Sequence, residues 1–79
     1  MKLRLYSLRG VQFEGDIISF NVKTTSGEIT VLDHHKPLVS VLQKGTAVAA
    51  TAKGEKKEFE IASGFLQMNE QNQLSVLVD

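Results

Sequence analysis

Apolar and polar residues alternate along most of this chain. The clearest runs carry an apolar side chain at every second position: Leu3 and Leu5; Ile18, Phe20 and Val22; Phe59 and Ile61; and Leu74, Val76 and Val78. Because successive side chains of a β-strand point to opposite faces, each run places its apolar set on one buried face. No long stretch shows an apolar stripe at the helical period. The pattern predicts short β-strands and no long helix.

Glycines fall between these runs at short intervals and mark the expected turns. Glu14 and Asp16, on either side of Gly15, are predicted to form one of these turns. Short strands with no helix to cross over the sheet favour an antiparallel β-sandwich or a β-barrel. The strands are predicted at residues 2–7, 11–14, 16–24, 28–32, 38–42, 46–53, 56–62, 65–68 and 73–78.

The composition excludes several classes of protein. Nine basic and nine acidic residues cancel, so no net charge attracts nucleic acid or an anionic membrane surface. The absence of cysteine excludes a disulfide framework, a thiolate zinc site and a cysteine nucleophile. The apolar runs are far shorter than the ~20 residues of a membrane span, and we expect no membrane insertion. A length of 79 residues predicts a single domain over residues 1–79.

One polar segment, Asp33-His34-His35, has residue types that occur in catalytic and metal sites. Adjacent side chains of an extended segment face opposite ways, so His34 and His35 are poorly placed to hold one ion. Asp33 and His35 share a side, which leaves open a hydrolase or metal site that requires a pocket or an ion there. No other catalytic or phosphate-binding motif is present. We predict no catalytic residue, metal, cofactor or small-molecule substrate.

Six segments carry motifs in a characteristic order and spacing. They are residues 11–17 (VQFEGDI), 26–32 (SGEITVL), 35–39 (HKPLV), 44–45 (KG), 63–66 (SGFL) and 74–79 (LSVLVD). Together they resemble the epsilon subunit of rotary proton-translocating ATP synthases, which is called delta in mitochondria. The similarity runs from about Leu3 to Asp79 and covers essentially the whole chain.

The resemblance implies an antiparallel β-sandwich of about nine or ten short strands at the foot of the central stalk. Such a domain binds the gamma subunit, rests on the polar loops of the membrane c-ring, and helps couple proton translocation to ATP synthesis or hydrolysis. It is not catalytic itself. The implied location is peripheral, at the cytoplasmic face of the bacterial plasma membrane or the equivalent organelle compartment.

The same resemblance implies which residues contact these partners. By position, Glu28 and His35 match the ring-facing loops of the family. Pro37, Leu38 and Val39 lie where contact with gamma or the ring is expected. Because exposed ion pairs contribute at most about 1 kcal/mol each, we expect binding to rest mainly on shape and apolar burial.

The chain also departs from the family. Residues 32–35 read LDHH where the family has L-P-G-H, Thr30 replaces a common glycine, and residues 62–64 contain one glycine in place of two. Family members continue into a C-terminal helical hairpin that carries their inhibitory and ATP-binding behaviour. The sequence stops at its last predicted strand, so we expect neither the hairpin nor ATP binding. These departures leave open an alternative, a free-standing β-sandwich adaptor that binds an unrelated protein.

Overall fold

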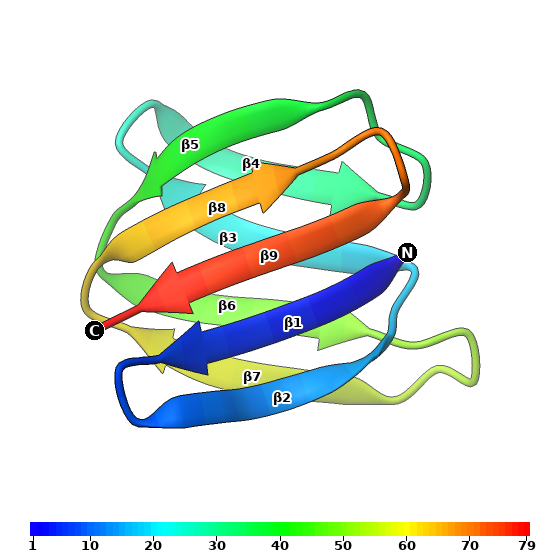
Figure 1. Ribbon diagram of the computed structural model, residues 1–79, viewed down its shortest axis with the longest axis horizontal. Helices are drawn as coiled ribbons and strands as arrows, with labels where there is room; N and C mark the ends of the chain where they lie inside the picture. The colour runs from blue at the N-terminus through cyan, green and yellow to red at the C-terminus, as the bar shows by residue number, and fades with distance from the viewer.

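The computed structural model describes residues 1–79, and nine β-strands follow the alternating runs of the sequence (Figure 1). The strands are β1 (Lys2–Ser7), β2 (Gly10–Asp16), β3 (Ser19–Thr24), β4 (Gly27–Leu32), β5 (Leu38–Leu42), β6 (Gly45–Ala50), β7 (Lys56–Ile61), β8 (Gly64–Met68) and β9 (Gln73–Val78). No helix of the length and apolar character needed to cross a membrane is found.

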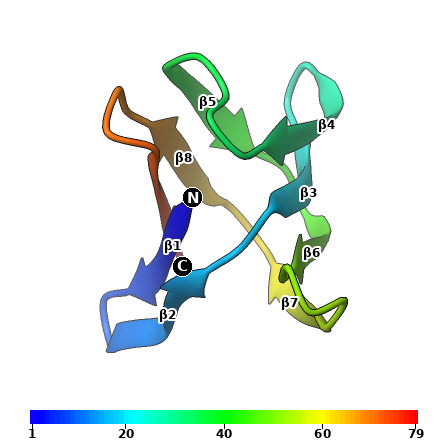
Figure 2. The ribbon, with the colours of Figure 1, turned by 90° about the vertical axis from the view of Figure 1, so that its right-hand side faces the viewer.

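The strands form two layers that face one another (Figure 2). One layer has the strand order β2-β1-β9-β8-β5 and the other β4-β3-β6-β7, with the pair Thr24 and Leu42 linking β3 to β5. This arrangement confirms the predicted all-β sandwich. All pairs are antiparallel except β1 with β9, which run parallel. The parallel pair joins the first strand of the chain to the last. Alternation within a strand does not predict which other strand it pairs with, so this pairing could not be predicted from the pattern.

The hydrophobic core fills the space between the layers. Leu3 and Leu5 of one layer and Phe20 of the other are at most 1% exposed, in a cluster of 16 buried apolar residues. On one side of the sandwich, Phe13 of β2 meets Phe59 of β7 edge to face, with ring centroids 5.6 Å apart. Each large apolar side chain that is fully buried contributes about 1.5–3 kcal/mol. The predicted alternation therefore produces one continuous core.

The reversal between β2 and β3 lies later in the chain than predicted. Glu14, Gly15 and Asp16 are the last residues of β2, paired with β1, and do not form a turn. Gly15 has no positive φ angle, so its backbone continues the strand. The chain reverses at Ile17 and Ile18, which are 1% and 46% exposed. The prediction of a buried Ile18 is therefore wrong, because the residue belongs to the turn and not to the alternating run.

Other strand boundaries shift by one to three residues. β6 ends at Ala50 because Thr51 begins a turn in which its N–H donates to the carbonyl oxygen of Glu55 at 2.9 Å. Gly54, with a φ of 87°, completes that turn. β8 begins at Gly64, one residue before the predicted start. The predicted strands at 46–53 and 56–62 are accordingly too long.

Candidate functional site

Glu28 lies near the start of β4, at one end of the sandwich. Its Oε2 accepts a hydrogen bond of 3.3 Å from Nδ2 of Asn21 on β3. The hairpin that carries it is closed by Thr24, whose Oγ1 donates to the carbonyl oxygen of Gly27 at 2.7 Å. The exposed carboxylate of Glu28 is thus presented on a well-ordered strand end.

His35 lies beyond the other end of β4, in the loop of residues 33–37. Its Nδ1 is 2.7 Å from the carbonyl oxygen of Lys36, and its backbone N–H donates to the carbonyl oxygen of Leu32 at 3.0 Å. Because Glu28 is at the start of β4 and His35 follows its end, the two residues lie at opposite ends of the sandwich (Figure 1). The structure does not bring these two predicted contacts together.

Pro37, Leu38 and Val39 form the entry to β5, at the same end as His35. Pro37 is exposed, Leu38 is half-buried against the core, and Val39 is 72% exposed on the outer face. The three residues line a shallow hollow of about 460 Å³ together with Gln67, Met68, Asn69, Glu70 and Gln71. Of the three, Val39 is the large apolar side chain that a partner can reach most fully.

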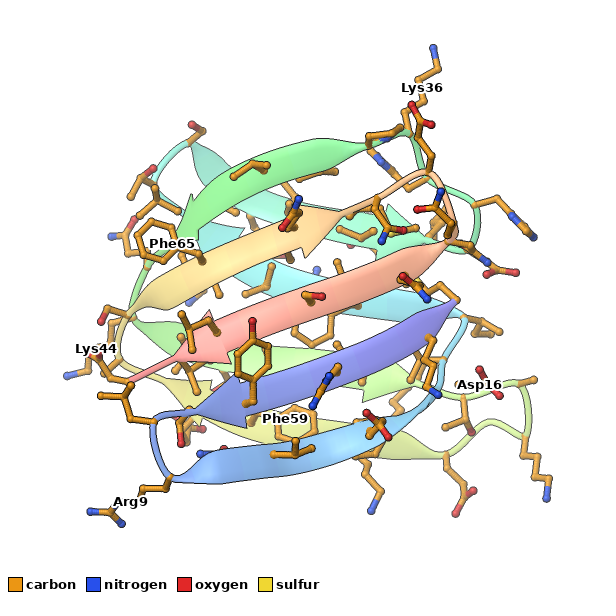
Figure 3. All side chains as sticks on the ribbon, in the orientation of Figure 1. Arg9, Asp16, Lys36, Lys44, Phe59 and Phe65 are labelled. Carbon is orange, nitrogen blue, oxygen red and sulfur yellow. The ribbon has the colours of Figure 1, made fainter.

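An apolar row crosses the outer face of the β2-β1-β9-β8-β5 layer, where Figure 3 labels its member Phe65. We use this name for five residues that neighbour one another through cross-strand pairing: Val41, Phe65, Leu77, Tyr6 and Val11. Val41 is 45% exposed, Phe65 is 56% exposed and Val11 is 52% exposed. Solvent-facing positions of a half-exposed sheet are usually polar, so a row of this kind marks a binding surface.

The alternating pattern of the sequence does not reveal this row. Each member stands at an outward position of a different strand, so one strand contributes only one apolar side chain. The signal becomes visible only after the strands are paired in register. Alternation predicted which positions face outward, whereas the order of strands in the layer decided that these five residues are neighbours.

In the next row on the same face, Val39 is apolar and the other four residues are polar or charged, with one charge of each sign. The row contains Val39, Gln67, Ser75, Arg4 and Glu14 in cross-strand register. Arg4 Nε lies 3.5 Å from Glu14 Oε2, and the Arg4 guanidinium lies 5.8 Å from the centre of the Tyr6 ring. These contacts satisfy the charges beside the apolar row, so the face as a whole suits an apolar, weakly charged partner.

The outer face of the other layer is polar. One cross-strand row contains Thr30, Asn21, Val48 and Glu58, and Lys23 pairs in register with Glu28. The edge strand β7 carries Lys56, Lys57, Glu58 and Glu60, charges of the kind that discourage pairing with another chain. The two outer faces therefore differ in character, and only one has an apolar row across the whole layer.

The structure contradicts a catalytic or metal pair of Asp33 and His35. Asp33 Oδ1 instead pairs with the α-amino group of Met1 and accepts a hydrogen bond of 2.9 Å from Nδ2 of Asn72. First the bond from the amine and then the bond from Asn72 hold the pKa of the Asp33 carboxyl below its ordinary value of 3.8. The hollow of about 220 Å³ beside this loop is lined by His34 and His35 but not by Asp33. No three His, Cys, Asp or Glu side chains are grouped so that they could hold a metal ion.

The family model and the relatives that match this chain all describe the same kind of protein. The family model described as "ATP synthase, Delta/Epsilon chain, beta-sandwich domain" matches residues 1–79. The ATP synthase epsilon chain of Clostridium novyi is 32% identical over 68 residues, which are 86% of this chain and 52% of the relative. Mitochondrial ATP synthase subunit delta of Yarrowia lipolytica is 30% identical over 61 residues, or 77% of this chain and 38% of the relative. The chain spans about half the length, or less, of these relatives.

Solved structures share the fold. A chain of the Euglena gracilis mitochondrial ATP synthase, described as OSCP/F1/c-ring, superposes with a TM-score of 0.90 at 22% identity, covering 96% of this chain and 48% of that one. A chain of the Tetrahymena thermophila mitochondrial ATP synthase, described as central stalk/c-ring, gives 0.85 at 16% identity, covering 99% and 62%. These likenesses concern the fold of the sandwich.

Proposed function

The chain belongs to the delta/epsilon family of ATP synthase subunits, and we propose that it acts as a non-catalytic central-stalk subunit linking the gamma subunit to the c-ring. Two observations support this role. Its fold recurs in chains from mitochondrial ATP synthase assemblies, one described as OSCP/F1/c-ring and one as central stalk/c-ring. Its distinctive surface is an apolar row on a β-sheet face, which suits binding to another protein. In this role it helps couple proton translocation to ATP synthesis or hydrolysis without acting on nucleotide itself.

The apolar row carries the proposal, and we assign the gamma subunit to it. Phe65, the second residue of β8, lies toward the Glu28 end of this outer face (Figure 3) and is the largest of the exposed apolar side chains in the row. Binding energy in protein interfaces is concentrated in a few large side chains that become fully buried. Val39 continues the apolar surface toward the other end of β5, which supports its predicted partner role.

The c-ring is assigned to the end of the sandwich that carries Glu28. The apolar row lies close to this end, because Val41 is next to the last residue of β5 and Phe65 is the second residue of β8. Leu8, 99% exposed in the β1–β2 turn, and Lys44 of the β5–β6 turn are at the same end. Contacts with gamma and with the ring then form one continuous surface. His35 and Pro37, at the opposite end, are proposed to contact gamma and not the ring.

In this role the protein is a peripheral component at the cytoplasmic face of the bacterial plasma membrane, or in the equivalent organelle compartment. The runner-up, a free-standing adaptor, uses the same apolar row with a different partner. A test of binding to gamma distinguishes the two functions, because an adaptor for an unrelated protein is not expected to bind gamma.

Phe65 is the residue at which the assignment of gamma to the apolar row can be tested. We expect Phe65→Ser to weaken binding of the chain to purified gamma subunit by about tenfold or more, because truncating a buried aromatic anchor costs about 2 kcal/mol. The measurement is the dissociation constant by surface plasmon resonance. Leu32→Ser is the matched control, since Leu32 is 57% exposed on the polar layer and Phe65 is 56% exposed.

The proposal fails if the unaltered chain does not bind gamma, which would favour the adaptor. It also fails if the two variants bind gamma equally well. Melting curves of both variants check that each is folded before binding is compared.

A further inference from the structure

The amino terminus of the chain is built into the end of the sandwich opposite Glu28. The α-amino group of Met1 donates to the carbonyl oxygen of Ile17 at 2.9 Å, and the Ile17 N–H donates back to the carbonyl oxygen of Met1 at 2.9 Å. The side chain of Met1 is fully buried, and the same amine forms an ion pair with Asp33. The terminal residue therefore connects the β2–β3 turn to the β4–β5 loop.

Asn72 extends this connection to the β8–β9 turn. Its Nδ2 donates to Asp33 Oδ1 at 2.9 Å, while its Oδ1 accepts the His34 N–H at 2.7 Å. Its carbonyl oxygen accepts the N–H of Lys2 at 3.1 Å. We call the group of Met1, Ile17, Asp33 and Asn72 the amino-terminal clasp. It joins three turns that are distant in sequence to the start of β1.

The clasp holds an unfavourable backbone conformation. His34 and Asn72 have φ angles of 63° and 60°, in the left-handed region that residues other than glycine seldom occupy. Such conformations persist where surrounding contacts over-determine them. The bond between the His34 N–H and Asn72, and the bond between Asn72 and Asp33, provide those contacts. Loosening the clasp therefore frees the loop that carries His35 and leads into β5.

The chemistry of the amine makes the clasp sensitive to covalent modification. An ammonium group has three N–H donors and a positive charge, and here it bonds both the Ile17 carbonyl oxygen and the Asp33 carboxylate. A secondary amide at the same nitrogen has one N–H and no charge. It can keep only one of these two bonds, and it places an additional acyl group at a buried position.

We propose that the α-amino group of Met1 is a modification-sensitive structural site: acylation of this amine, or a peptide bond to a preceding residue, opens the clasp. The effect is local to this end of the sandwich, because the bonds that are lost connect turns and not strands. The inference does not depend on the proposed function.

The test compares two forms of the chain of residues 1–79, one with a free amine and one with an α-acetyl group, in the unaltered sequence and in Asp33→Asn. We expect acetylation to lower the melting temperature by about 4 °C or more in the unaltered chain. In Asp33→Asn we expect less than about half of that shift, because partners in one network do not contribute additively. Asp16→Asn is the control, since Asp16 is an exposed carboxylate at the same end with no ion pair to the amine.

A second measurement applies even if the acetylated chain does not fold. In the folded chain, we expect the α-amine to react with an acetylating reagent about tenfold more slowly than in Asp33→Asn, because reaction requires the clasp to open. Mass spectrometry of the amino-terminal peptide gives both rates. Equal rates in the two chains, or an equal melting shift in both backgrounds, would overturn the proposal.

Discussion

His34 and Asn72 show how single residues define one end of this molecule. Both adopt left-handed backbone conformations without being glycine, and each is held by a hydrogen bond to a distant segment. Asparagine and histidine occupy this conformation more often than most residues, but both have a Cβ atom and so bear a steric cost that glycine lacks. The motif resemblance implies glycine at the position of His34, and glycine reaches the same conformation without steric cost. His34 is therefore a residue at which a substitution is expected to increase stability.

We expect His34→Gly to raise the free energy of unfolding by about 0.5–1 kcal/mol, because it removes the steric cost of the positive φ angle while keeping the backbone N–H. Urea denaturation measures the change. His35→Gly is the control, since His35 has no positive φ angle. This substitution relieves no strain and only increases the conformational entropy of the unfolded chain. Equal effects of the two substitutions, or a destabilised His34→Gly chain, would show that the strain at His34 is not significant.

The clasp also predicts how stability depends on pH. The Met1 amine and then Asn72 lower the pKa of the Asp33 carboxyl in the folded chain, with a smaller contribution from His34, whose Nε2 lies 3.7 Å from Asp33 Oδ2. A lowered pKa means that the contribution of Asp33 to stability is complete above its ordinary value of 3.8 and decreases as the pH falls through the folded-state value. We expect the difference in melting temperature between the unaltered chain and Asp33→Asn to be constant near neutral pH and to decrease below about pH 4. A difference that is unchanged at low pH would contradict this.

At the scale of elements, β8 depends on the close approach of two backbones at its first residue. A Cβ added at Gly64 would lie 2.1 Å from the carbonyl oxygen of Leu77, on the neighbouring strand β9. β8 and β9 lie in the centre of their layer, between β1 and β5. The loss of this approach would disturb the surface that carries Phe65 as well as the core beneath it.

We expect Gly64→Ala to lower the free energy of unfolding by about 2 kcal/mol or more, because the contact is with backbone and cannot be relieved by a side-chain rotation. Gly15→Ala is the control, since a Cβ at Gly15 lies 3.4 Å from the end of the Phe13 ring, which can move. Chemical denaturation of both variants provides the comparison. Similar stabilities would mean that β8 and β9 adjust easily at this point.

At the scale of the whole molecule, the sandwich has two different outer faces and two different ends. One face carries the apolar row and the other is polar; one end carries Glu28 and the other carries the clasp. This asymmetry allows one small domain to meet two partners in a fixed orientation. The family resemblance places ATP binding in a C-terminal helical hairpin, and residues 1–79 contain no helix.

We therefore expect residues 1–79 to show no saturable heat of ATP binding in isothermal titration calorimetry at nucleotide concentrations up to about 1 mM. The positive control is gamma subunit in the same cell, which is expected to bind. Saturable ATP binding by this chain would contradict the expectation that ATP binding in the family resides in the helical hairpin.

Much of the fold followed from local pattern. Alternation predicted the strands. It also predicted that the side chains of Leu3, Leu5, Leu74 and Val76 are buried, because the face to which a strand residue points is set by its position in the sequence. The pattern was wrong in predicting a turn at Gly15 and a buried Ile18. A glycine within a strand resembles a glycine in a turn, and the turn was therefore predicted too early in the chain. The resemblance placed both Glu28 and His35 in ring-facing loops, although the predicted strand at 28–32 begins at Glu28 and ends before His35, and so already separates them.

The sequence by itself determined the strands, their buried faces and the family, since each depends on residues close together in the chain or on motifs in a fixed order. Only the tertiary structure decided that Phe65, Leu77 and Tyr6 are neighbours and that Met1 meets Asp33, 32 positions away. Pairing of β1 with β9 and closure of the end turns create these contacts, and both bring together residues that the chain separates. A surface formed across strands is a property of the packing, whereas the burial of one face is a property of each strand.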